Sequence, residues 1–238
     1  MITGKRFLLI DDSSTAISLI RSMLNTCGIT NDNIDSTTDS MKAIRLLASH
    51  NYDIVISDYN MRHHIDGGLI FDEVKQRKLL PSDGVFICVT GDNSEQVVSH
   101  FIELEPDDYL IKPFCAAVFV ERIEKVLERK SALYPLLLAI DNKEYQTAIG
   151  LCQRYKKNFP MYSGYIDRIN GDCLLRSERH LEAKHFYEEA CKNTDHLWPR
   201  VGFGQALKEL GELKEAQAVF QEILDKYPKQ PLARKHLA

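Results

Sequence analysis

The sequence contains no hydrophobic run long enough to cross a membrane, so a protein with membrane-spanning helices is not expected. A membrane-spanning helix needs roughly 18 or more consecutive apolar residues. Charged residues make up 27% of this 238-residue chain, and no apolar stretch approaches that length. Met1–Gly4 leads directly into an apolar segment at Phe7, so no signal peptide is expected. We therefore expect a cytoplasmic protein that has no membrane partner.

Paired cysteines and an excess of positive charge are also missing. The six cysteines include no Cys-x-x-Cys pair, which favours reduced thiols. Residues 1–130 carry 14 Lys and Arg against 20 Asp and Glu, a net charge of −6. Residues 131–238 carry 16 against 14, a net charge of +2. Neither half is a basic patch, so a nucleic-acid partner is not expected.

What the first 130 residues do contain is an alternation of short apolar runs with amphipathic segments. The runs predict strands at Phe7–Ile10, Ile34–Thr37, Ile54–Asp58, Val85–Thr90 and Asp108–Ile111. Strands that alternate with helices are typical of a doubly wound parallel sheet with helices on both faces. We therefore predict an α/β fold with a five-stranded parallel sheet.

Five helices are expected between and after these strands. Ser13 or Ser14 is a good cap for the first helix, which Cys27–Gly28 should end, and Asp39 or Ser40 should cap the second. Further helices are expected around Leu69–Val74, at Ser94–Leu104 and at Ala117–Lys130. The apolar faces of the first three are predicted to include Ile17, Leu19, Ile20, Met23 and Leu24, then Met41, Ile44, Leu47 and Ala48, then Leu69, Ile70, Phe71 and Val74.

Polar side chains follow four of the predicted strands at the point where each strand ends. They are Asp11–Asp12, Asp58, Thr90 and Lys112. The carboxyl ends of parallel strands share one edge of the sheet, so these groups should meet in one cleft. Three crowded carboxylates need a cation among them, and their hard oxygen ligands suit Mg²⁺. A lysine and a hydroxyl for phosphate oxygens then favour phosphoryl transfer to a carboxylate.

Four segments at these strand ends resemble the receiver domain of bacterial response regulators. They read LLIDDSS, DIVISDYNM, VFICVTGD and DDYLIKPF, and the resemblance covers roughly residues 4–130. It implies a flavodoxin-like fold with Asp58 as the phosphoacceptor. It further implies that Asp11, Asp12, Asp58 and the backbone carbonyl of Asn60 hold Mg²⁺. Lys112 is then the partner of the phosphoryl group, Thr90 and Tyr109 are the switch pair, and Pro113 follows a cis peptide bond.

The sequence departs from the usual receiver pattern at three places. Arg62 stands where family members usually carry proline, and the loop up to Gly67 is one residue longer. Glu105–Pro106 replaces the common Gly-Ala pair, and Gly91 follows Thr90 where alanine is usual. These departures bear on the shape of the loops and on the lifetime of the phosphoryl group.

Several residues of this half have a plainer interpretation beside the functional one. Asp58 could belong to a receiver that no longer takes phosphate, and Tyr109 could be a packing residue. His63–His64 with Asp66 suggests a metal site, but a solvated loop is the better interpretation because adjacent residues rarely chelate one ion well. Cys115 near the cleft is better read as a bystander thiol than as a redox group.

The second half contains an internal repeat. Ala148, Ala183 and Ala216 are separated by 35 and 33 residues, and each precedes a larger side chain at a fixed distance: Cys152, Tyr187 and Phe220. Gly171 and Gly204 lie 33 residues apart in the preceding predicted helices, and Pro160, Asp195 and Pro228 close the units. Each unit predicts a helix, a tight turn and a second helix, so that the small residue lets the paired helices approach. A generic helical bundle is the alternative.

This pattern resembles tetratricopeptide repeats, with about three units over roughly residues 132–228. We therefore predict two domains, residues 1–130 and residues 131–238, with no Gly- or Pro-rich tether between them. The last segment, Gln230–Ala238, reads as the start of another helix, so the native chain is expected to extend beyond Ala238.

By resemblance, such repeats bind a protein or peptide in a groove lined by the first helix of each unit. The side chains expected to face this groove are Tyr165, Arg168, Asp172, Trp198, Gln205 and Lys208. For Trp198, packing at the start of a helix is an equally good interpretation.

Together these features predict a two-component response regulator whose receiver switches a protein-binding repeat domain. The resemblance implies a sensor histidine kinase or a phosphotransfer protein as phosphodonor, and homodimerisation as an alternative output. No enzyme activity is expected beyond self-phosphorylation from small phosphodonors and autodephosphorylation. The rival hypotheses are an unphosphorylated scaffold, an enzyme that acts on the partner kinase, and a histidine phosphotransfer module. No histidine of the second half lies on an obvious stripe of a helical bundle, which disfavours the last of these.

Overall fold

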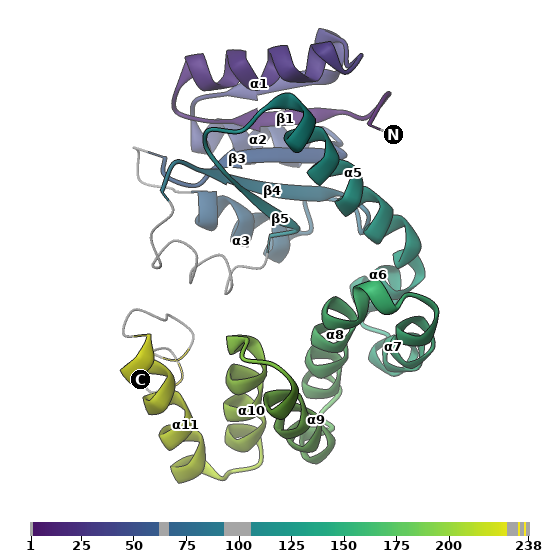
Figure 1. Cartoon of the computed structure of the whole chain (residues 1–238), viewed down its shortest axis with the longest axis vertical. Helices are drawn as coiled ribbons and strands as arrows, with labels where there is room; N and C mark the ends of the chain where they lie inside the picture. The colour runs from purple at the N-terminus through teal and green to yellow at the C-terminus, as the bar shows by residue number, and fades with distance from the viewer. Residues whose placement is uncertain (1, 62–66, 93–105, 228–232, 234–235, 237–238) are drawn as a thin grey trace. The chain divides into compact units, whose positions relative to one another are not determined.

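The computed structural model describes residues 2–61, 67–92, 106–227, 233 and 236 of the chain. The chain divides into two compact units, Met1–Ala132 and Leu133–Ala238 (Figure 1). The boundary between the units lies two residues beyond the one expected at residue 130, because the last helix of the first unit continues to Ala132. No helix among the described residues is long and apolar enough to cross a membrane.

The first unit is built on a five-stranded sheet whose strands all run parallel. The strands are β1 (Phe7–Ile10), β2 (Ile34–Thr37), β3 (Ile54–Asp58), β4 (Val85–Thr90) and β5 (Asp108–Ile111). Their spatial order is β2-β1-β3-β4-β5, with each neighbouring pair parallel. This is the flavodoxin-like order, and it confirms the predicted fold class.

The described helices of this unit cover the sheet on both faces. They are α1 (Ser14–Thr26), α2 (Ser40–Ser49), α3 (Gly67–Arg77) and α5 (Ala116–Ala132). The sequence offered two alternative N-caps for each of α1 and α2. At α1 the side chain of Ser13 accepts from the N–H group of Ala16, and at α2 the side chain of Asp39 accepts from the N–H group of Lys42. The helix predicted at Ser94–Leu104 lies outside the described residues.

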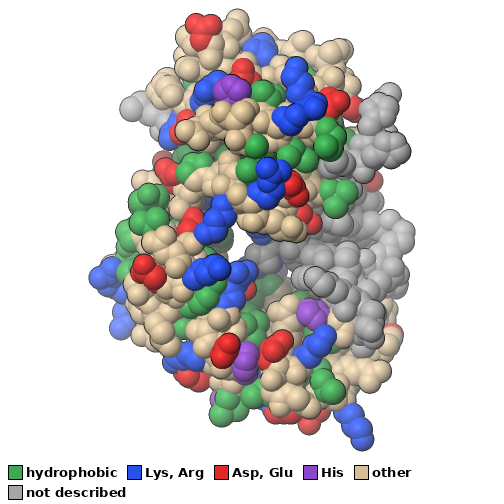
Figure 2. Space-filling model, turned by 180° about the vertical axis from the view of Figure 1, so that it is seen from behind, with side chains coloured by type: hydrophobic (Ala, Val, Ile, Leu, Met, Phe, Trp, Pro, Cys, Tyr) green, Lys and Arg blue, Asp and Glu red, His purple; other side chains and the backbone are tan. Residues whose placement is uncertain are grey.

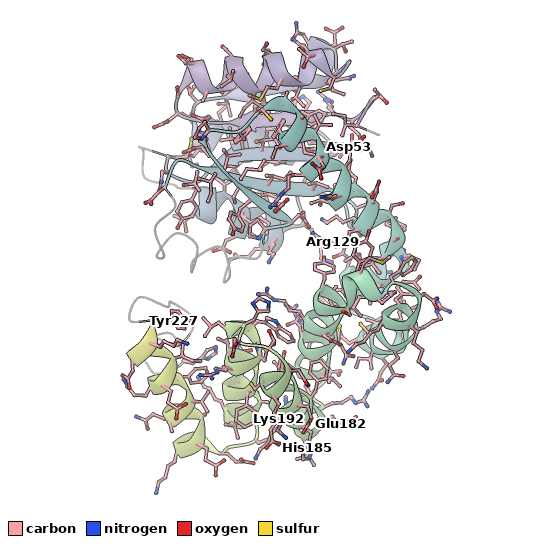
Figure 3. All side chains as sticks on the ribbon, viewed as in Figure 1. Asp53, Arg129, Glu182, His185, Lys192 and Tyr227 are labelled. Carbon is pink, nitrogen blue, oxygen red and sulfur yellow. The ribbon has the colours of Figure 1, made fainter. Side chains whose placement is uncertain are left out.

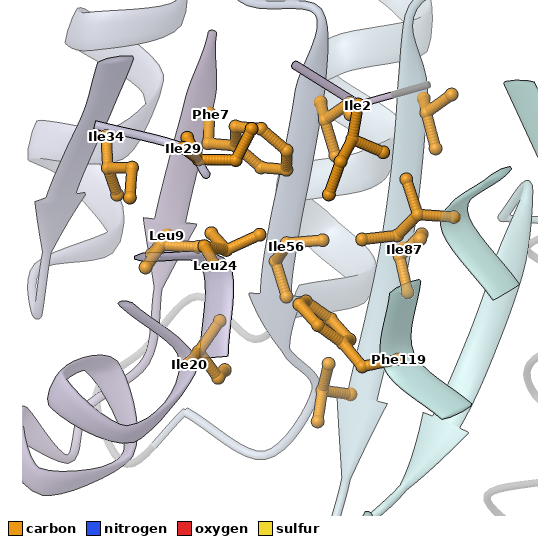
Figure 4. Packing of buried hydrophobic residues seen from close by; sticks show 14 of the residues in the cluster. Ile2, Phe7, Leu9, Ile20, Leu24, Ile29, Ile34, Ile56, Ile87 and Phe119 are labelled. Atoms are coloured by element: carbon orange, nitrogen blue, oxygen red, sulfur yellow. The ribbon is translucent and has the colours of Figure 1, made fainter. Parts of the chain in front are cut away.

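Successive strand residues point to opposite faces, and this alternation produces two cores. Phe7 and Leu9 of β1 point to the core shared with α1 and α5, whereas Leu8 and Ile10 point to the core shared with α2 and α3. Figure 4 shows the first core, in which Ile56 and Ile87 of the central strands lie beside Phe119 of α5. The strands β1, β3 and β4 are buried on both faces and read as apolar runs, which is why the sequence located them.

Four side chains that the sequence assigned to buried helix faces are exposed: Leu19, Met41, Ala48 and Leu69. Leu19 is 57% exposed, Met41 54% and Leu69 52%. In α2 the buried stripe runs instead through Ser40, Ala43 and Leu47, spaced three and four residues apart. The predicted faces were therefore wrong at these positions, because hydrophobicity alone set their width, whereas only a narrow stripe of each helix touches the sheet.

The second unit consists of helices paired into three hairpins. They are α6 (Tyr134–Asp141), α7 (Tyr145–Asn158), α8 (Ser163–Arg176), α9 (His180–Asn193), α10 (Leu197–Glu209) and α11 (Leu213–Lys226). A 3₁₀ turn, η2, spans Pro160–Tyr162. Residues 133–227 are all described, and they contain no strand. Pro135 lies in the first turn of α6, where a missing N–H group costs no helical hydrogen bond.

Glycines opposite large rings allow the helices of the second unit to approach closely. The ring of Tyr187 on α9 lies against both Gly171 of α8 and Gly202 of α10, and the ring of Phe220 lies against Gly204. A Cβ atom at Gly171 would stand 2.6 Å from the Tyr187 ring, far inside van der Waals contact, and one at Gly202 would lie closer still. The repeat spacing had indicated Gly171 and Gly204, but Gly202 lies outside that register.

Exposed charged side chains of both signs lie close together on the surface. On the face in Figure 2, Lys and Arg side chains are interspersed with Asp and Glu side chains. On α9 the exposed side chains include Glu182, His185 and Lys192, labelled in Figure 3. This mixture agrees with the small formal net charge of −4.

The glycine packing predicts opposite effects for two alanine substitutions. Gly202→Ala should destabilise the second unit by about 1–3 kcal/mol, because the new methyl group overpacks the Tyr187 ring. Gly150→Ala is the matched control: Gly150 lies in α7 with nothing within 4 Å of an added Cβ, so the change should stabilise by up to about 1 kcal/mol. Urea unfolding followed by fluorescence of Trp198, the only tryptophan, measures both. Equal or greater stability of Gly202→Ala than of Gly150→Ala would contradict the packing described.

Candidate functional site

The carboxyl edge of the sheet gathers the polar side chains that the sequence pointed to. Asp11 and Asp12 follow β1, Asp58 ends β3, Thr90 ends β4 and Lys112 follows β5. The chain leaves β1 toward β2 on one side and reaches β3 on the other, so the helices diverge at this point. Ligands of open α/β sheets bind at such a switch point.

The ammonium group of Lys112 lies between two buried carboxylates. Its Nζ atom donates to Asp11 Oδ2 and to Asp58 Oδ1, each at 2.7 Å. Asp11 is 3% exposed and Asp58 7%. The predicted convergence of these three residues from β1, β3 and β5 is therefore seen in the structure. One lysine thus holds together two strand ends that would otherwise repel each other.

The pKa values of Asp58 and Lys112 are both raised in this cluster, but for different reasons. Burial raises the pKa of Asp58; Lys112 opposes the shift, and the neighbouring charges of Asp11 and Asp12 add to it. Burial lowers the pKa of Lys112, but its bonds with Asp11 and Asp58 outweigh burial and raise it overall. The lysine has two carboxylate partners, whereas Asp58 has one cation against two other acids. The cluster therefore carries more negative charge than Lys112 can balance.

The oxygen atoms near Asp58 are of the type that a hard divalent cation prefers as ligands. Asp11 also accepts a bond from the N–H group of Ser13 at 2.9 Å, Asp12 is half-buried, and Asn60 is exposed two residues past β3. Among the described residues, no three His, Cys, Asp or Glu side chains surround a common centre. Mg²⁺ prefers few protein oxygens and several waters, so an excess of negative charge with carboxylate and carbonyl donors suits it.

The two expected switch residues lie on neighbouring strands. Thr90 is buried, and its Oγ1 atom accepts from the N–H group of Asp92 at 3.0 Å. Tyr109 is half-buried and packs against the core under α2 and α3. The expected cis peptide bond between Lys112 and Pro113 is present.

Gly67 is a residue of the site that the sequence analysis did not single out. Its N–H group donates to the carbonyl oxygen of Tyr59 at 3.0 Å. An added Cβ atom there would overlap the backbone carbonyl oxygen of Asp58 and lie 3.0 Å from Tyr59 Cα. The start of α3 thus rests directly on the end of β3. The Gly67–Gly68 pair was a signal of this approach, but the sequence indicated only a loop there.

Some residues named from the sequence take no part in the described site. Arg62, His63, His64 and Asp66 lie outside the described residues, as does Glu105. Cys115 is an exposed free thiol. A Cβ atom at Gly91 would meet nothing within 4 Å, so alanine would fit there as well.

In the second unit the six expected groove residues divide between packing and surface. Arg168 of α8 is half-buried, and burial lowers its pKa to about 10. Trp198 packs edge-on against Tyr187, with ring centroids 6.1 Å apart, which agrees with its interpretation as a packing residue. The other four are Tyr165, packed against the core; Asp172, paired with Arg176 at 2.7 Å; Gln205, 3.1 Å from His236; and Lys208, exposed.

Two family models match the chain, one in each unit. The response regulator receiver domain model matches residues 7–124, and a tetratricopeptide repeat model matches residues 174–238. The chemotaxis protein CheY of Pseudomonas aeruginosa is 30% identical over 124 residues, which is 52% of this chain and 97% of that protein. CheY-3 of Vibrio cholerae is 25% identical over 52% of this chain and 92% of its own length.

Solved structures of receiver domains are similar to the first unit. The signal receiver domain of an HD domain-containing protein from Pseudomonas fluorescens Pf-5 is 24% identical, with a TM-score of 0.47, over 53% of this chain and 97% of that chain. The response regulator TrrA of Thermotoga maritima, in complex with Mg²⁺ and BeF, is 27% identical, with a TM-score of 0.45, over 52% of this chain and 99% of that chain.

The raised pKa of Asp58 predicts how one substitution changes stability with pH. A carboxyl group whose pKa is higher in the folded state favours folding in acid, and that contribution is lost as pH rises through the raised pKa. Asp58→Asn should therefore melt at a higher temperature than the wild type at pH 7. The difference should shrink as pH falls toward about 4, the ordinary carboxyl pKa.

Asp53 provides the matched control for this comparison. It lies at the opposite edge of the sheet (Figure 3), where it accepts bonds from Lys5 Nζ and the Arg6 N–H group. Asp53→Asn removes a carboxylate with useful partners and should not raise the melting temperature. Calorimetric melting between pH 4 and pH 8 measures both variants. An Asp58→Asn variant less stable than the wild type at pH 7 would contradict the charge balance described.

Proposed function

Because the chain belongs to the response regulator receiver family and carries tetratricopeptide repeats after its receiver domain, we propose that it is a phosphorylation-switched adaptor. A histidine kinase or phosphotransfer protein phosphorylates Asp58 in the cytoplasm, and the repeats pass the signal on by binding another protein. The observation that carries this proposal is the Lys112 ammonium group, which lies 2.7 Å from both Asp11 and Asp58.

Asp58 has the environment that a carboxylate nucleophile needs. Its oxygen attacks the phosphorus atom, an acyl phosphate bond forms, and the bond between phosphorus and the donor's leaving atom breaks. Burial disfavours its ionised form, so the attacking charge is poorly solvated. The phosphoryl group adds negative charge to the cluster, and this added charge needs a cationic partner. Lys112 can shift one of its bonds from Asp58 to a phosphoryl oxygen, because a lysine is a compact cation with three donors.

We propose that Asp11, Asp12, Asp58 and the backbone carbonyl of Asn60 hold Mg²⁺. When bound, this cation supplies positive charge to the phosphoryl oxygens. The support is the donor set, which is entirely oxygen, together with an acid cluster that Lys112 does not neutralise. Asp11 already accepts bonds from Lys112 and the Ser13 N–H group, so its carboxylate must rearrange or share its lone pairs.

Thr90 and Tyr109 are the proposed switch. The Thr90 hydroxyl is buried at the end of β4 and hydrogen-bonded to the backbone of Asp92. A phosphoryl group on Asp58 offers it a charged acceptor, which binds a hydroxyl more strongly than a peptide group does. The turn of Thr90 toward the phosphate leaves space that the half-buried Tyr109 ring can fill.

The proposed output is protein binding by the repeat unit. Tyr165, Arg168 and Asp172 lie on α8, and Trp198, Gln205 and Lys208 lie on α10, the first helices of the second and third hairpins. We propose that the side chains exposed along these helices bind the partner. The alternative output is homodimerisation, in which the receiver domains of two copies of the chain bind each other. Neither output requires an enzyme activity beyond phosphoryl transfer to Asp58 and its hydrolysis.

The phosphoacceptor role predicts labelling that depends on Mg²⁺. Acetyl phosphate should add one phosphoryl group to the wild-type chain when Mg²⁺ is present and none when EDTA removes it, because the acid cluster repels the donor. Asp58→Asn should remain unlabelled in both conditions. Intact-mass measurement distinguishes these cases. Equal labelling of wild type and Asp58→Asn would favour the passive-scaffold hypothesis.

The switch role predicts that labelling and output can be separated. Thr90→Ala should still accept phosphate, since Asp58 and Lys112 are unchanged, but should lose the phosphate-dependent change in self-association or partner binding. Sedimentation with and without beryllofluoride measures this change, and Gly91→Ala is the control because its Cβ meets nothing within 4 Å. If the wild type shows the same self-association and the same partner binding with and without beryllofluoride, the switched-adaptor proposal fails.

A further inference from the structure

Lys130 is a buried lysine in the last turn of α5, and phosphoryl transfer does not use it. It is 8% exposed, its ammonium group donates to the carbonyl oxygen of Gly84, and it lies 2.8 Å from Asp107 Oδ2. A buried ammonium group costs several kcal/mol unless it is paired. Apolar residues of similar volume often replace such a pair without loss of stability, so stability alone does not account for a lysine here.

Asp107 connects this lysine to two strands of the sheet. Its Oδ2 atom also accepts from the N–H group of Phe86 at 2.8 Å, and its own N–H group donates to the Phe86 carbonyl at 3.0 Å. Arg129, labelled on α5 in Figure 3, donates to the Asp107 carbonyl at 2.8 Å. One aspartate thus joins β4, the start of β5 and the last turn of α5.

The same helix is attached to β5 a second time, at the proposed switch tyrosine. Arg122 of α5 pairs with Asp108 and donates to the carbonyl oxygen of Tyr109 at 3.1 Å. Asp108 in turn accepts from the N–H group of Tyr109 at 2.8 Å. Arg122 and Lys130 are eight residues apart, roughly 12 Å along a helix. Helix α5 is therefore fixed to β5 at two separate levels.

We propose that Lys130 is a positioning residue for signal output. Through its ion pair with Asp107, it makes the last turn of α5 move together with β4 and β5. Thr90 lies in β4 and Tyr109 in β5, so a shift of either strand reaches Asp107 along a stiff, hydrogen-bonded segment. Helix α5 ends at Ala132, and the next residue, Leu133, is buried in the core of the repeat unit. The inference rests on the proposed phosphorylation of Asp58.

Hydrogen exchange of the full chain tests the proposal. The readout is amide exchange in residues 128–138 with and without beryllofluoride and Mg²⁺, and Asp58 labelling by acetyl phosphate is measured in parallel. In the wild type, beryllofluoride should change exchange there by about fivefold or more, the lower end of usual coupling energies. Lys130→Met should keep the labelling and lose this change.

Two further variants make the test specific. Lys125→Met is the control, because Lys125 lies on the same helix but is exposed, and its ammonium group pairs with Glu121 of the same helix. It should respond as the wild type does. Asp107→Asn keeps an acceptor for the Phe86 N–H group and removes the ionic partner of Lys130. It should lose the response as Lys130→Met does, and it serves if Lys130→Met fails to fold.

Three outcomes would overturn the inference. If both variants keep the wild-type response, Lys130 does not position the helix end. If neither variant folds, the pair serves the fold and not transmission. If the wild type is labelled at Asp58 without any change in residues 128–138, no signal reaches this turn, although the phosphoacceptor proposal stands. Absence of labelling in the wild type instead overturns the proposed function itself.

Discussion

One ammonium group between two buried carboxylates is the constraint on which the receiver site depends. Lys112 bridges Asp11 and Asp58, and it can do so only because β1, β3 and β5 end at the same edge of one sheet. The bridge leaves negative charge unbalanced, and burial, together with the charges of Asp11 and Asp12, raises the pKa of Asp58. A divalent cation held in this cluster would offset this charge and that of an incoming phosphoryl group.

The sequence predicted most of this arrangement because the signals were local. Strands buried on both faces read as apolar runs, and a polar residue at the end of each run located the site. The predicted buried faces were wrong at Leu19, Met41, Ala48 and Leu69, because hydrophobicity alone set the width of each face, whereas only a narrow stripe of each helix touches the sheet. Gly67 was missed because its contact with the Asp58 backbone joins segments that only the fold brings together.

The ends of elements were harder to predict than their centres, and α5 illustrates why. A lysine and an arginine near the end of a helix usually indicate a solvated last turn. Lys130 is buried instead, because its ammonium group binds Asp107 and the Gly84 carbonyl, which are 23 and 46 residues away in the sequence. In the repeats, the spacing of alanine and glycine predicted the hairpins, but Gly202 supports Tyr187 from outside that register. Both features depend on a partner distant in sequence.

The central claim is that Asp58, and no other acid of the cluster, receives the phosphoryl group. Borohydride reduces an aspartyl phosphate to homoserine, so it marks the modified residue permanently. The most direct measurement is peptide mapping of the wild-type chain after reaction with acetyl phosphate and Mg²⁺ and reduction with borohydride. The account predicts homoserine at position 58 alone. Homoserine at position 11 or 12, or at no position, would contradict it.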